Sequence, residues 1–256
     1  MILTIDCGNT NVVFAVYDAD KQCAAWRCGN YPKRTADEYA VWLSQLFELE
    51  GFSIDEIDGA IVASVVPETK VNLVELCCQH FGGEPMLVDD PSINLGLSVK
   101  IERPDHVGDD RLANAVSAYV RFGGPLIIID FGTATTFDVI DDEGSYLGGV
   151  IAPGINLSVE ALHQAAARLP RISVSRPSSV IGKATVPAMQ SGIYWGYVGL
   201  LEGLIDRIGK EYGTSLKAVA TGGLASLFFD ATNAITAVDS SMTTRGLAEI
   251  YRRNTK

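Results

Sequence analysis

Residues 1–17 read MILTIDCGNTNVVFAVY, and residues 126–140 read LIIIDFGTATTFDVI. Each stretch has an apolar run, a turn of the form Asp-x-Gly that is rich in Thr or Asn, and a second apolar run. Runs of this length predict β-strands, so each stretch predicts a strand, a polar turn and another strand. Asp6 and Asp130 lie 124 positions apart in a chain of 256 residues, which indicates that its two halves share one architecture.

The two Asp-x-Gly turns suit the binding of phosphate groups and a metal ion. Glycine allows a close approach of the main chain to phosphate oxygens, and backbone N–H groups with Thr or Asn side chains can donate to them. An aspartate at the end of a strand can hold Mg²⁺ or another cation. A plain hairpin is the alternative, but its repetition in a matching context favours a nucleotide-dependent phosphoryl transfer enzyme. The sequence has neither GxxxxGK[ST] nor GxGxxG, which excludes P-loop and Rossmann sites.

The composition is that of an ordinary globular protein with an acidic excess. Hydrophobic residues make up 47% and charged residues 20% of the chain, which argues against intrinsic disorder. The formal net charge of −11 argues against a nucleic-acid or anionic-membrane surface, although a nucleotide needs only local positive potential. We expect no transmembrane span and no signal peptide, and five cysteines without a CxxC motif suit reduced thiols in the cytoplasm. Three scattered histidines give no zinc-ligand spacing.

The order of the predicted elements indicates a duplicated α/β architecture. Strands are predicted at 1–5, 12–17, 23–28, 57–66, 85–88, 99–102, 126–130, 137–141, 145–151 and 218–221. Helices are predicted at 38–50, 68–81, 109–121, 154–168, 192–212 and 244–253. No flexible linker separates the halves, so we expect domains of about 1–115 and 116–256 around one cleft.

The segment Gly108-Asp109-Asp110-Arg111 opens a predicted helix and carries a second candidate site. A carboxylate there can accept a proton from a substrate hydroxyl, and an arginine can bind a carboxylate or phosphate through two hydrogen bonds. The alternative is a helix cap, a role that Asp109 can fill while Asp110 is functional. Two adjacent carboxylates can also raise the pKa of one of them, which suits a base near neutral pH.

Two glycine-rich segments follow predicted strands in the second half. Thr221-Gly222-Gly223 permits close approach of a flat ligand such as adenine, and a simple strand-to-helix turn is the alternative. Residues 148–154, GGVIAPG, can wall a substrate pocket or allow close packing of the main chain.

Taken in order along essentially the whole chain, these motifs resemble the type III pantothenate kinases, which belong to the acetate and sugar kinase, Hsp70 and actin superfamily. Each motif is modest, whereas their order and coverage are specific. The matching segments are residues 6–10 (DCGNT), 64–67 (SVVP), 108–111 (GDDR), 130–135 (DFGTAT), 146–149 (YLGG), 153–154 (PG), 169–170 (LP), 181–185 (IGKAT), 191–192 (SG) and 221–223 (TGG).

The resemblance implies an α/β fold of duplicated actin-like (ribonuclease H-like) domains, each a mixed sheet flanked by helices, with a cleft between them. The N-terminal domain would carry the first phosphate loop and the substrate motif. The C-terminal domain would carry the second phosphate and cation loop, the adenosine side and the dimer contacts. The implied activity is ATP-dependent phosphorylation of pantothenate at its primary hydroxyl, the first step toward coenzyme A. The family works as a homodimer, with pantothenate bound close to the subunit interface.

The resemblance also implies roles for individual residues. Asp110 matches the catalytic base, Asp130 the ligand of an activating monovalent cation (K⁺ or NH₄⁺), and Asp6 lies near Mg²⁺. The predicted contacts with ATP and its phosphates, which include the two glycines of the Thr221-Gly222-Gly223 motif, are Asp6, Gly8, Asn9, Thr10, Asn11, Val12, Thr133, Gly222 and Gly223. The predicted pantothenate contacts are Ile101, Gly108, Asp109, Asp110, Arg111 and Thr185.

The chain departs from the family pattern on the pantothenate side. Where the family usually has Asn-Pro-x-Glu-Val before Gly108, residues 103–107 read RPDHV. Ile101 replaces a common aromatic residue, and Asp109 stands where a small residue is frequent.

Two alternative functions stay open at this point. One is a non-catalytic nucleotide-binding accessory or regulatory homologue. A pure binder needs no base, so this alternative is disfavoured by the residues that the chain retains, which are Asp6, Asp110, Arg111 and Asp130. The other is a kinase of another small hydroxy acid, and its only support is the changes at Ile101, Arg103 and His106.

Overall fold

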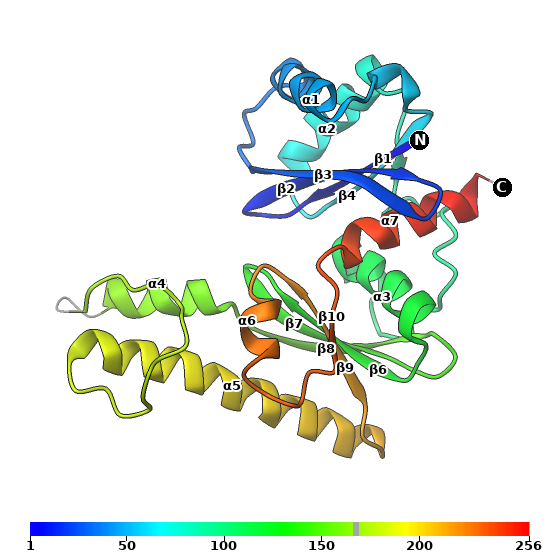
Figure 1. The fold of residues 1–256 in the computed structure, drawn as a ribbon. Helices are drawn as coiled ribbons and strands as arrows, with labels where there is room; N and C mark the ends of the chain where they lie inside the picture. Colours follow the sequence, from blue (N-terminus) through cyan, green and yellow to red (C-terminus); the bar gives the residue numbers. More distant parts are fainter. Residues whose placement is uncertain (166–168, 256) are drawn as a thin grey trace. The chain divides into compact units, whose positions relative to one another are not determined.

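The computed structural model describes residues 1–165 and 169–255 (Figure 1). The chain forms two compact units, of which unit 1 comprises Met1–Phe122 with Ser241–Lys256 and unit 2 comprises Gly123–Ser240. The units therefore change over after helix α3 (Asp109–Phe122), whereas the sequence suggested a division near residue 115. The last helix, α7 (Met242–Asn254), returns to unit 1.

The two units contain sheets of identical topology. The sheet of unit 1 has the order β3-β2-β1-β4-β5, with bounds β1 Ile2–Cys7, β2 Asn11–Asp18, β3 Lys21–Gly29, β4 Gly59–Ser64 and β5 Met86–Leu87. The sheet of unit 2, read in the matching direction, has the order β8-β7-β6-β9-β10, with bounds β6 Leu126–Phe131, β7 Ala134–Ile140, β8 Tyr146–Pro153, β9 Lys217–Gly222 and β10 Ala237–Val238. In both, three antiparallel strands are extended by two parallel ones. The prediction of two mixed sheets flanked by helices is confirmed.

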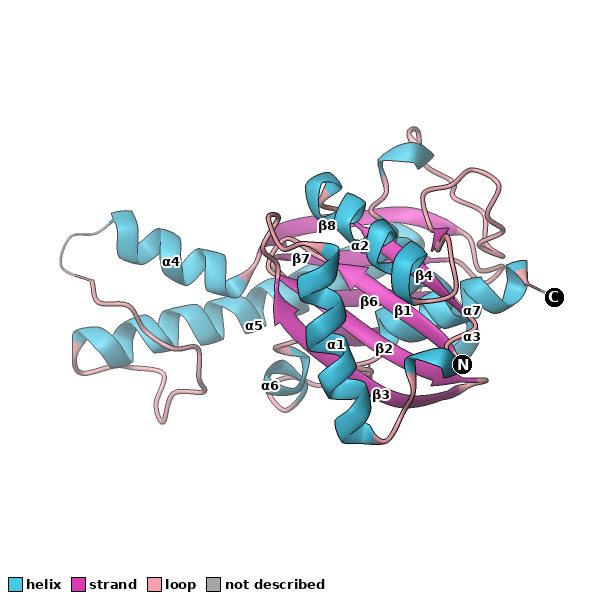
Figure 2. Cartoon of the chain, turned by 90° about the horizontal axis from the view of Figure 1, so that it is seen from above, coloured by secondary structure: helices cyan, strands magenta, loops and turns pink. Residues whose placement is uncertain are grey.

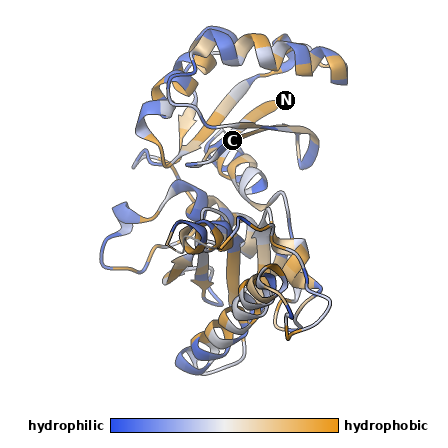
Figure 3. Cartoon of the chain, turned by 90° about the vertical axis from the view of Figure 1, so that its left-hand side faces the viewer, coloured by the Kyte–Doolittle hydropathy of each residue, from blue (hydrophilic) through white to orange (hydrophobic). Residues whose placement is uncertain are grey.

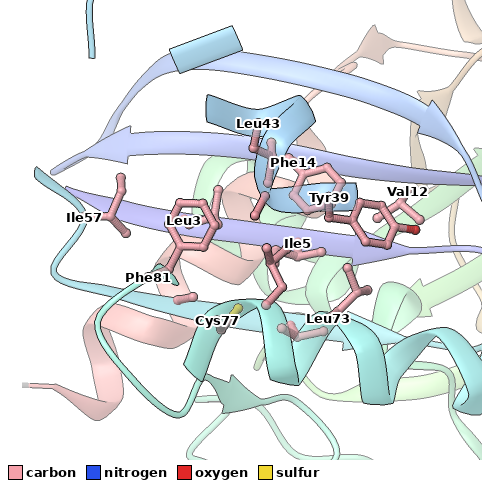
Figure 4. Close-up of a cluster of buried hydrophobic side chains, with 14 of the residues drawn as sticks. Leu3, Ile5, Val12, Phe14, Tyr39, Leu43, Ile57, Leu73, Cys77 and Phe81 are labelled. Atoms are coloured by element: carbon pink, nitrogen blue, oxygen red, sulfur yellow. The ribbon is translucent and has the colours of Figure 1, made fainter. Parts of the chain in front are cut away.

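In unit 1, helices α1 (Ala36–Glu50) and α2 (Pro67–His80) cover one face of the sheet. Thr35 and Glu38 form a capping box that starts α1, and Gly51 at φ 79° ends it. Apolar side chains from alternate strand positions meet the inner faces of these helices, as Figure 4 shows for Leu3 and Leu73 among others. Two short 3₁₀ helices, η1 (Ile54–Glu56) and η2 (Pro104–His106), lie in connecting segments.

The opposite face of this sheet explains why α7 belongs to unit 1. Leu247 and Ile250 of α7 pack with Val116 of α3 and with Ile61 of β4 in one buried cluster. A Cβ atom on Gly246 would lie 1.9 Å from the carbonyl oxygen of Ala113, so glycine is required where the two helices meet. The sequence predicted the helix, but the expected division at about residue 115 placed it in the second half, whereas the structure groups it with unit 1.

In unit 2, helix α5 (Thr185–Tyr212) and the short helix α6 (Ala225–Phe229) pack on the sheet. The ring of Phe131 stacks on that of Phe228 with centroids 5.3 Å apart, in a core that also contains Tyr194 and Tyr197. Helix α4 (Ile155–Ala165) runs beside α5 (Figure 2). Figure 3 shows the concentration of apolar residues along the strands.

A few elements differ from their predicted form. The strand predicted at 99–102 is wrong, because Val99 makes only an isolated bridge and the next residues bend; four alternating residues are too few to distinguish a strand from a loop. Helix α5 begins at Thr185, not at Gly192. The helix predicted to end near Arg168 is described as α4 only to Ala165, and Arg168 lies outside the described residues. No helix within the described ranges is long and apolar enough to span a membrane.

Candidate active site

The first Asp-x-Gly turn connects β1 and β2. Asp6 is the penultimate residue of β1. Within the turn, the N–H of Gly8 donates to the carbonyl of Asn11 at 3.0 Å. Asn9 and Thr10 form the exposed tip of the turn. Val12, a predicted ATP contact, has its side chain fully buried in the core, so only its main chain can reach a ligand.

The first turn is fastened by two residues that the motif analysis did not single out. The main-chain N–H of Asn30 donates to the carbonyl of Thr10 at 2.9 Å, and its side-chain Nδ2 donates to the carbonyl of Gly8 at 2.8 Å. The hydroxyl of Thr69 donates to Oδ1 of Asn30 at 2.8 Å. The only signal in the sequence was a Gly29-Asn30 pair directly after a predicted strand, which is common in ordinary turns.

The start of α3 lies beside this first turn within unit 1. Cys7 pairs with Ser64 in the parallel register of β1 and β4, and the N–H of Val65 donates to the carbonyl of Cys7 at 3.1 Å. The N–H of Ser64 donates to Oδ2 of Asp109 at 3.0 Å. Ser64, the last residue of β4, and Val65 directly after it thus join the first Asp-x-Gly turn to the Gly108–Arg111 segment.

The two adjacent aspartates of α3 have different environments. Asp109 is buried, and burial raises the pKa of its carboxyl to about 6, while the hydrogen bond from Ser64 opposes the rise. Asp110 is half-buried, and its Oδ1 accepts from the N–H of Arg111 at 2.8 Å. Like-charge repulsion from Asp110 makes a small contribution to the pKa rise of Asp109, so burial is the main cause. Asp109 is therefore an internal anchor, and Asp110 is the more accessible carboxylate.

Gly108 makes room for that carboxylate. A Cβ atom on Gly108 would lie 2.6 Å from Oδ1 of Asp110 and 3.4 Å from a methyl group of Val65. Arg111 and Ile101, two more predicted pantothenate contacts, are half-buried in the same unit. The structure thus gives a steric reason for glycine at position 108, which the sequence pattern alone did not supply.

Residues 103–106, which carry most of the departure from the family pattern, are exposed. Arg103 holds Asp105 through two hydrogen bonds, of 3.2 Å from Nε and 3.0 Å from Nη2. Nε2 of His106 lies 3.6 Å from the same carboxylate. Asp105 is therefore engaged locally by its own neighbours.

The second Asp-x-Gly turn connects β6 and β7 in unit 2. The N–H of Gly132 donates to the carbonyl of Ala134 at 3.0 Å, and Thr133 is exposed at the tip. The N–H of Gly154 donates to the carbonyl of Thr133 at 3.2 Å. A Cβ atom on Gly154 would lie 2.1 Å from that carbonyl oxygen. The turn is therefore held by direct contact between two main-chain segments.

The glycine motif at the end of β9 lies against Asp130, the predicted cation ligand. Asp130 and Thr221 are partners in the parallel register of β6 and β9. Gly222 has φ 89°, and a Cβ atom on it would lie 2.7 Å from Oδ1 of Asp130. Gly223 is exposed beside it. The structure therefore brings Asp130 and Gly222 together, and the cation and nucleotide roles of these residues stay predictions.

A third fastening of the second turn comes from α5. The hydroxyl of Tyr197 makes a short hydrogen bond with Oγ1 of Thr135 and donates to the carbonyl of Pro153 at 3.1 Å. Thr185 is exposed as the first residue of the same helix, and within the described ranges it makes no hydrogen bond to the second turn.

The side chains present fit a cation held jointly with phosphate oxygens. No group of three or more His, Cys, Asp or Glu side chains in the described part of the chain is placed to hold a metal by itself. Asp6 and Asp130 are single carboxylates at turns whose tips are exposed, and Mg²⁺ in kinases is commonly bound by one or two carboxylates plus substrate phosphates. All five cysteines are free thiols.

Comparison with known proteins gives a consistent result. A family model described as type III pantothenate kinase matches residues 2–207. A type III pantothenate kinase from Rhodospirillum rubrum is 59% identical over 254 residues, covering 99% of this chain and 99% of the relative. One from Paramagnetospirillum magneticum is 58% identical over 254 residues, covering 99% and 98%.

Solved structures of low identity share the fold. The activator of the 2-hydroxyisocaproyl-CoA dehydratase from Clostridium difficile, with bound ADPNP, has a TM-score of 0.58 at 12% identity and covers 100% of this chain and 98% of that one. The ethanolamine utilization protein EutJ from Carboxydothermus hydrogenoformans has a TM-score of 0.57 at 15% identity, covering 96% and 88%. These likenesses concern the fold alone.

Proposed function

This chain belongs to the type III pantothenate kinase family, and we propose that it transfers the γ-phosphoryl group of ATP to the primary hydroxyl of pantothenate. One observation carries this proposal beyond family membership. The hydrogen bonds through Ser64 and Val65 hold the accessible carboxylate segment of α3 beside the first Asp-x-Gly turn. A phosphate-binding turn and a candidate base in one rigid arrangement are what phosphoryl transfer to an alcohol requires.

Asp110 is the proposed base. Its carboxylate is half-buried at the start of α3, and it accepts a hydrogen bond from the next main-chain N–H. It takes the proton from the attacking hydroxyl as the new oxygen–phosphorus bond forms and the bond between the γ-phosphorus and ADP breaks, with ADP as the leaving group. Arg111 binds the pantothenate carboxylate. Gly108, Asp109, Ile101 and Thr185 complete the proposed substrate contacts.

The two turns are the proposed phosphate sites. N–H groups and side chains of Gly8, Asn9, Thr10 and Asn11 donate to phosphate oxygens on the side of unit 1, with Asp6 next to Mg²⁺. Thr133 donates on the side of unit 2, and Gly222 with Gly223 lies against the adenosine. Mg²⁺ supplies charge that offsets the negative charge of the transferred group.

A monovalent cation, K⁺ or NH₄⁺, is the proposed partner of Asp130. The support is local, because the main chain of Gly222 packs so closely against Asp130 that a Cβ atom would lie 2.7 Å from Oδ1 of the carboxylate. Asp130 would hold the cation, whose charge would offset the negative charge of the carboxylate and of nearby phosphate groups.

A homodimer is the proposed assembly, and its support comes from the surface of α5. The cytoplasm is the proposed location, and its support comes from the cysteines. Along α5, four glycines would each accept a Cβ atom with no atom, or only the tip of an arginine side chain, near it: Gly192, Gly196, Gly199 and Gly203. A helix face with so little side-chain bulk suits close packing against a second copy. The free thiols suit a reducing compartment.

The test is ADP release from Mg-ATP by the purified protein, with and without pantothenate and with and without K⁺. We expect turnover that needs pantothenate and rises with K⁺. Turnover with another small hydroxy acid but not with pantothenate would refute the substrate assignment. ATP binding without turnover on any hydroxy acid would instead support a regulatory homologue.

A further inference from the structure

Asn30 makes three polar contacts that all concern the first turn. It follows β3 directly, and its main chain and side chain each donate to a different carbonyl of the turn, those of Thr10 and Gly8. Its Nδ2 also lies 3.7 Å from the sulfur of Cys7, the last residue of β1. Asn30 thus ties the end of β1 and the turn to the end of β3.

Thr69 determines how the Asn30 amide is oriented. Its side chain is fully buried on the first turn of α2, and its hydroxyl donates to Oδ1 of Asn30. An amide has donors on one side and an acceptor on the other, so a donor held at Oδ1 directs Nδ2 toward Gly8. A buried hydroxyl is costly unless it is hydrogen-bonded, so Thr69 has a defined partner and not an incidental one.

The hydrogen bonds from Asn30 determine which main-chain groups of the first turn face a ligand. A trans peptide unit carries its C=O and N–H in opposite directions. Because the carbonyl of Gly8 is drawn toward Asn30, the N–H of Asn9 in the same peptide unit points away from Asn30, at the exposed tip. A carbonyl turned outward would repel phosphate oxygens, whereas an N–H turned outward attracts them.

We propose that Asn30 and Thr69 are positioning residues for the ATP phosphates, acting through the peptide planes of the first turn without touching the nucleotide. This inference rests on the proposed function of that turn as a phosphate site. It predicts an effect on ATP and none on pantothenate, because the Gly108–Arg111 segment is held through Ser64 and Val65, in hydrogen bonds that involve neither Asn30 nor Thr69.

The experiment compares Asn30→Ala, Thr69→Val, Thr69→Ser and the double variant Asn30→Ala/Thr69→Val. The readouts are the Kd of an unreactive ATP analogue with Mg²⁺, by calorimetry, and the KM values for ATP and pantothenate. We expect Asn30→Ala to raise the Kd and the KM for ATP about tenfold, the loss corresponding to one to two backbone-directed hydrogen bonds, with the KM for pantothenate unchanged. Thr69→Val should raise them about three- to fivefold, and Thr69→Ser should restore wild-type values.

The double variant tests whether the two residues form one chain of contacts. Once Asn30 is gone, the hydroxyl of Thr69 has no amide to orient, so the double variant should bind ATP no more weakly than Asn30→Ala alone. Effects that simply multiply would overturn the coupling.

Asn72 offers a matched control in the same unit. Its Nδ2 also donates to two main-chain carbonyls, those of Pro32 at 3.2 Å and Arg34 at 2.9 Å. Asn72→Ala should therefore cost similar stability in urea unfolding and leave the Kd for the ATP analogue within about twofold. Equal effects of Asn30→Ala and Asn72→Ala on ATP would show a general structural role and overturn the proposal.

The outcomes separate this inference from the proposed function. If the wild-type protein binds the analogue and phosphorylates pantothenate, but Asn30→Ala and Thr69→Val bind the analogue normally, only the positioning role fails. If the wild-type protein binds the analogue and does not phosphorylate pantothenate, the kinase assignment fails while the Kd values still decide the positioning role. If the wild-type protein binds no nucleotide, both fail. Should Asn30→Ala not fold, the pair Thr69→Val and Thr69→Ser decides the question alone.

Discussion

The two Asp-x-Gly turns occupy the same place in sheets of the same topology, yet they are held by different chemistry. The turn of unit 1 is fastened by polar side chains, with Asn30 reaching its carbonyls and Thr69 reaching Asn30. The turn of unit 2 is fastened mainly by its own backbone, through the contact of Gly154 with Thr133. A duplicated fold has thus preserved the positions of the turns and not the means of holding them.

Because of this difference, we expect the two turns to respond differently to amino-acid substitutions. Side-chain hydrogen bonds can be removed one at a time without a steric clash, so the first turn should lose ligand affinity in steps. A main-chain contact at a glycine leaves no room for any side chain, so the second turn should fail through packing. The expected effects below run from the largest to the smallest.

The largest effect concerns the chemistry that only unit 1 carries. Asp110→Asn removes the proposed base and keeps the shape of the side chain. We expect kcat to fall about 10²–10⁴-fold, measured as pantothenate-dependent ADP release, with the Kd for ATP within about twofold. Asp105→Asn is the control, because that exposed carboxylate is bound to Arg103. Full turnover of the Asp110 variant would assign the base elsewhere.

The second effect contrasts the glycines of the two turns directly. Gly154→Ala would place a Cβ atom 2.1 Å from the carbonyl oxygen of Thr133, and we expect a loss of about 3 kcal/mol or more in the free energy of unfolding. Gly8→Ala would meet nothing closer than the carbonyl oxygen of Asn11 at 3.5 Å, so its stability should stay within about 1 kcal/mol of wild type. Urea unfolding measures both. Equal losses would mean that the two turns are packed alike.

The third effect is a pH dependence located beside the first turn. Burial raises the pKa of Asp109 to about 6, above its ordinary value of 3.8, so the folded protein binds more protons than the unfolded chain between these values. Stability should therefore fall as the pH rises from about 4 to about 6, by up to about 3 kcal/mol from this group, and stay level above. Asp109→Asn should lose this part of the pH dependence in urea unfolding from pH 4 to 7.5. Parallel curves for the two proteins would refute the assignment.

The fourth effect tests the cation assigned to the second turn. Asp130→Asn weakens the proposed K⁺ site, and we expect the activation of ADP release by K⁺ to fall about tenfold. The Mg²⁺ dependence should change little, because Mg²⁺ is assigned to Asp6 on the other turn. K⁺ activation equal to that of the wild type would remove Asp130 from the cation site.

The smallest effect concerns the hydroxyl that supports the second turn. Tyr197→Phe removes the partner of Thr135 and of the Pro153 carbonyl, so we expect a loss of about 1 kcal/mol in the free energy of unfolding. Tyr194→Phe is the matched control, because the Tyr194 hydroxyl is buried without a hydrogen-bond partner in the described part of the chain. Chemical denaturation should show no loss for this control. A similar loss for both would mean that the hydrogen bonds of Tyr197 contribute nothing.

The sequence predicted much of the fold, because the signals involved are local. The two strand–turn–strand stretches, with most helices and strands, follow from periodicity and from turn residues that act over a few positions. The membership of α7 in unit 1 could not be predicted in this way, because it depends on Gly246 meeting Ala113, two residues far apart in the chain.

The candidate site shows the same limit. The motifs located the turns and the Gly108–Arg111 segment, because each is a short run of characteristic residues. They gave no sign of Asn30 and Thr69, whose significance lies in long-range hydrogen bonds from otherwise ordinary positions. The roles of Asp6, Asp110, Asp130 and the predicted ligand contacts stay predictions until the variants are measured.

The return of α7 to unit 1 sets an order of events during translation. Unit 2 is one uninterrupted stretch, Gly123–Ser240, inserted into unit 1. At about 5–20 residues per second, the ribosome spends on the order of ten seconds making it, while the surface of α3 that receives Gly246 waits uncovered. We therefore expect unit 2 to be complete before unit 1. Until α7 emerges from the ribosome, the nascent chain should expose the apolar face of α3, to which chaperones can bind.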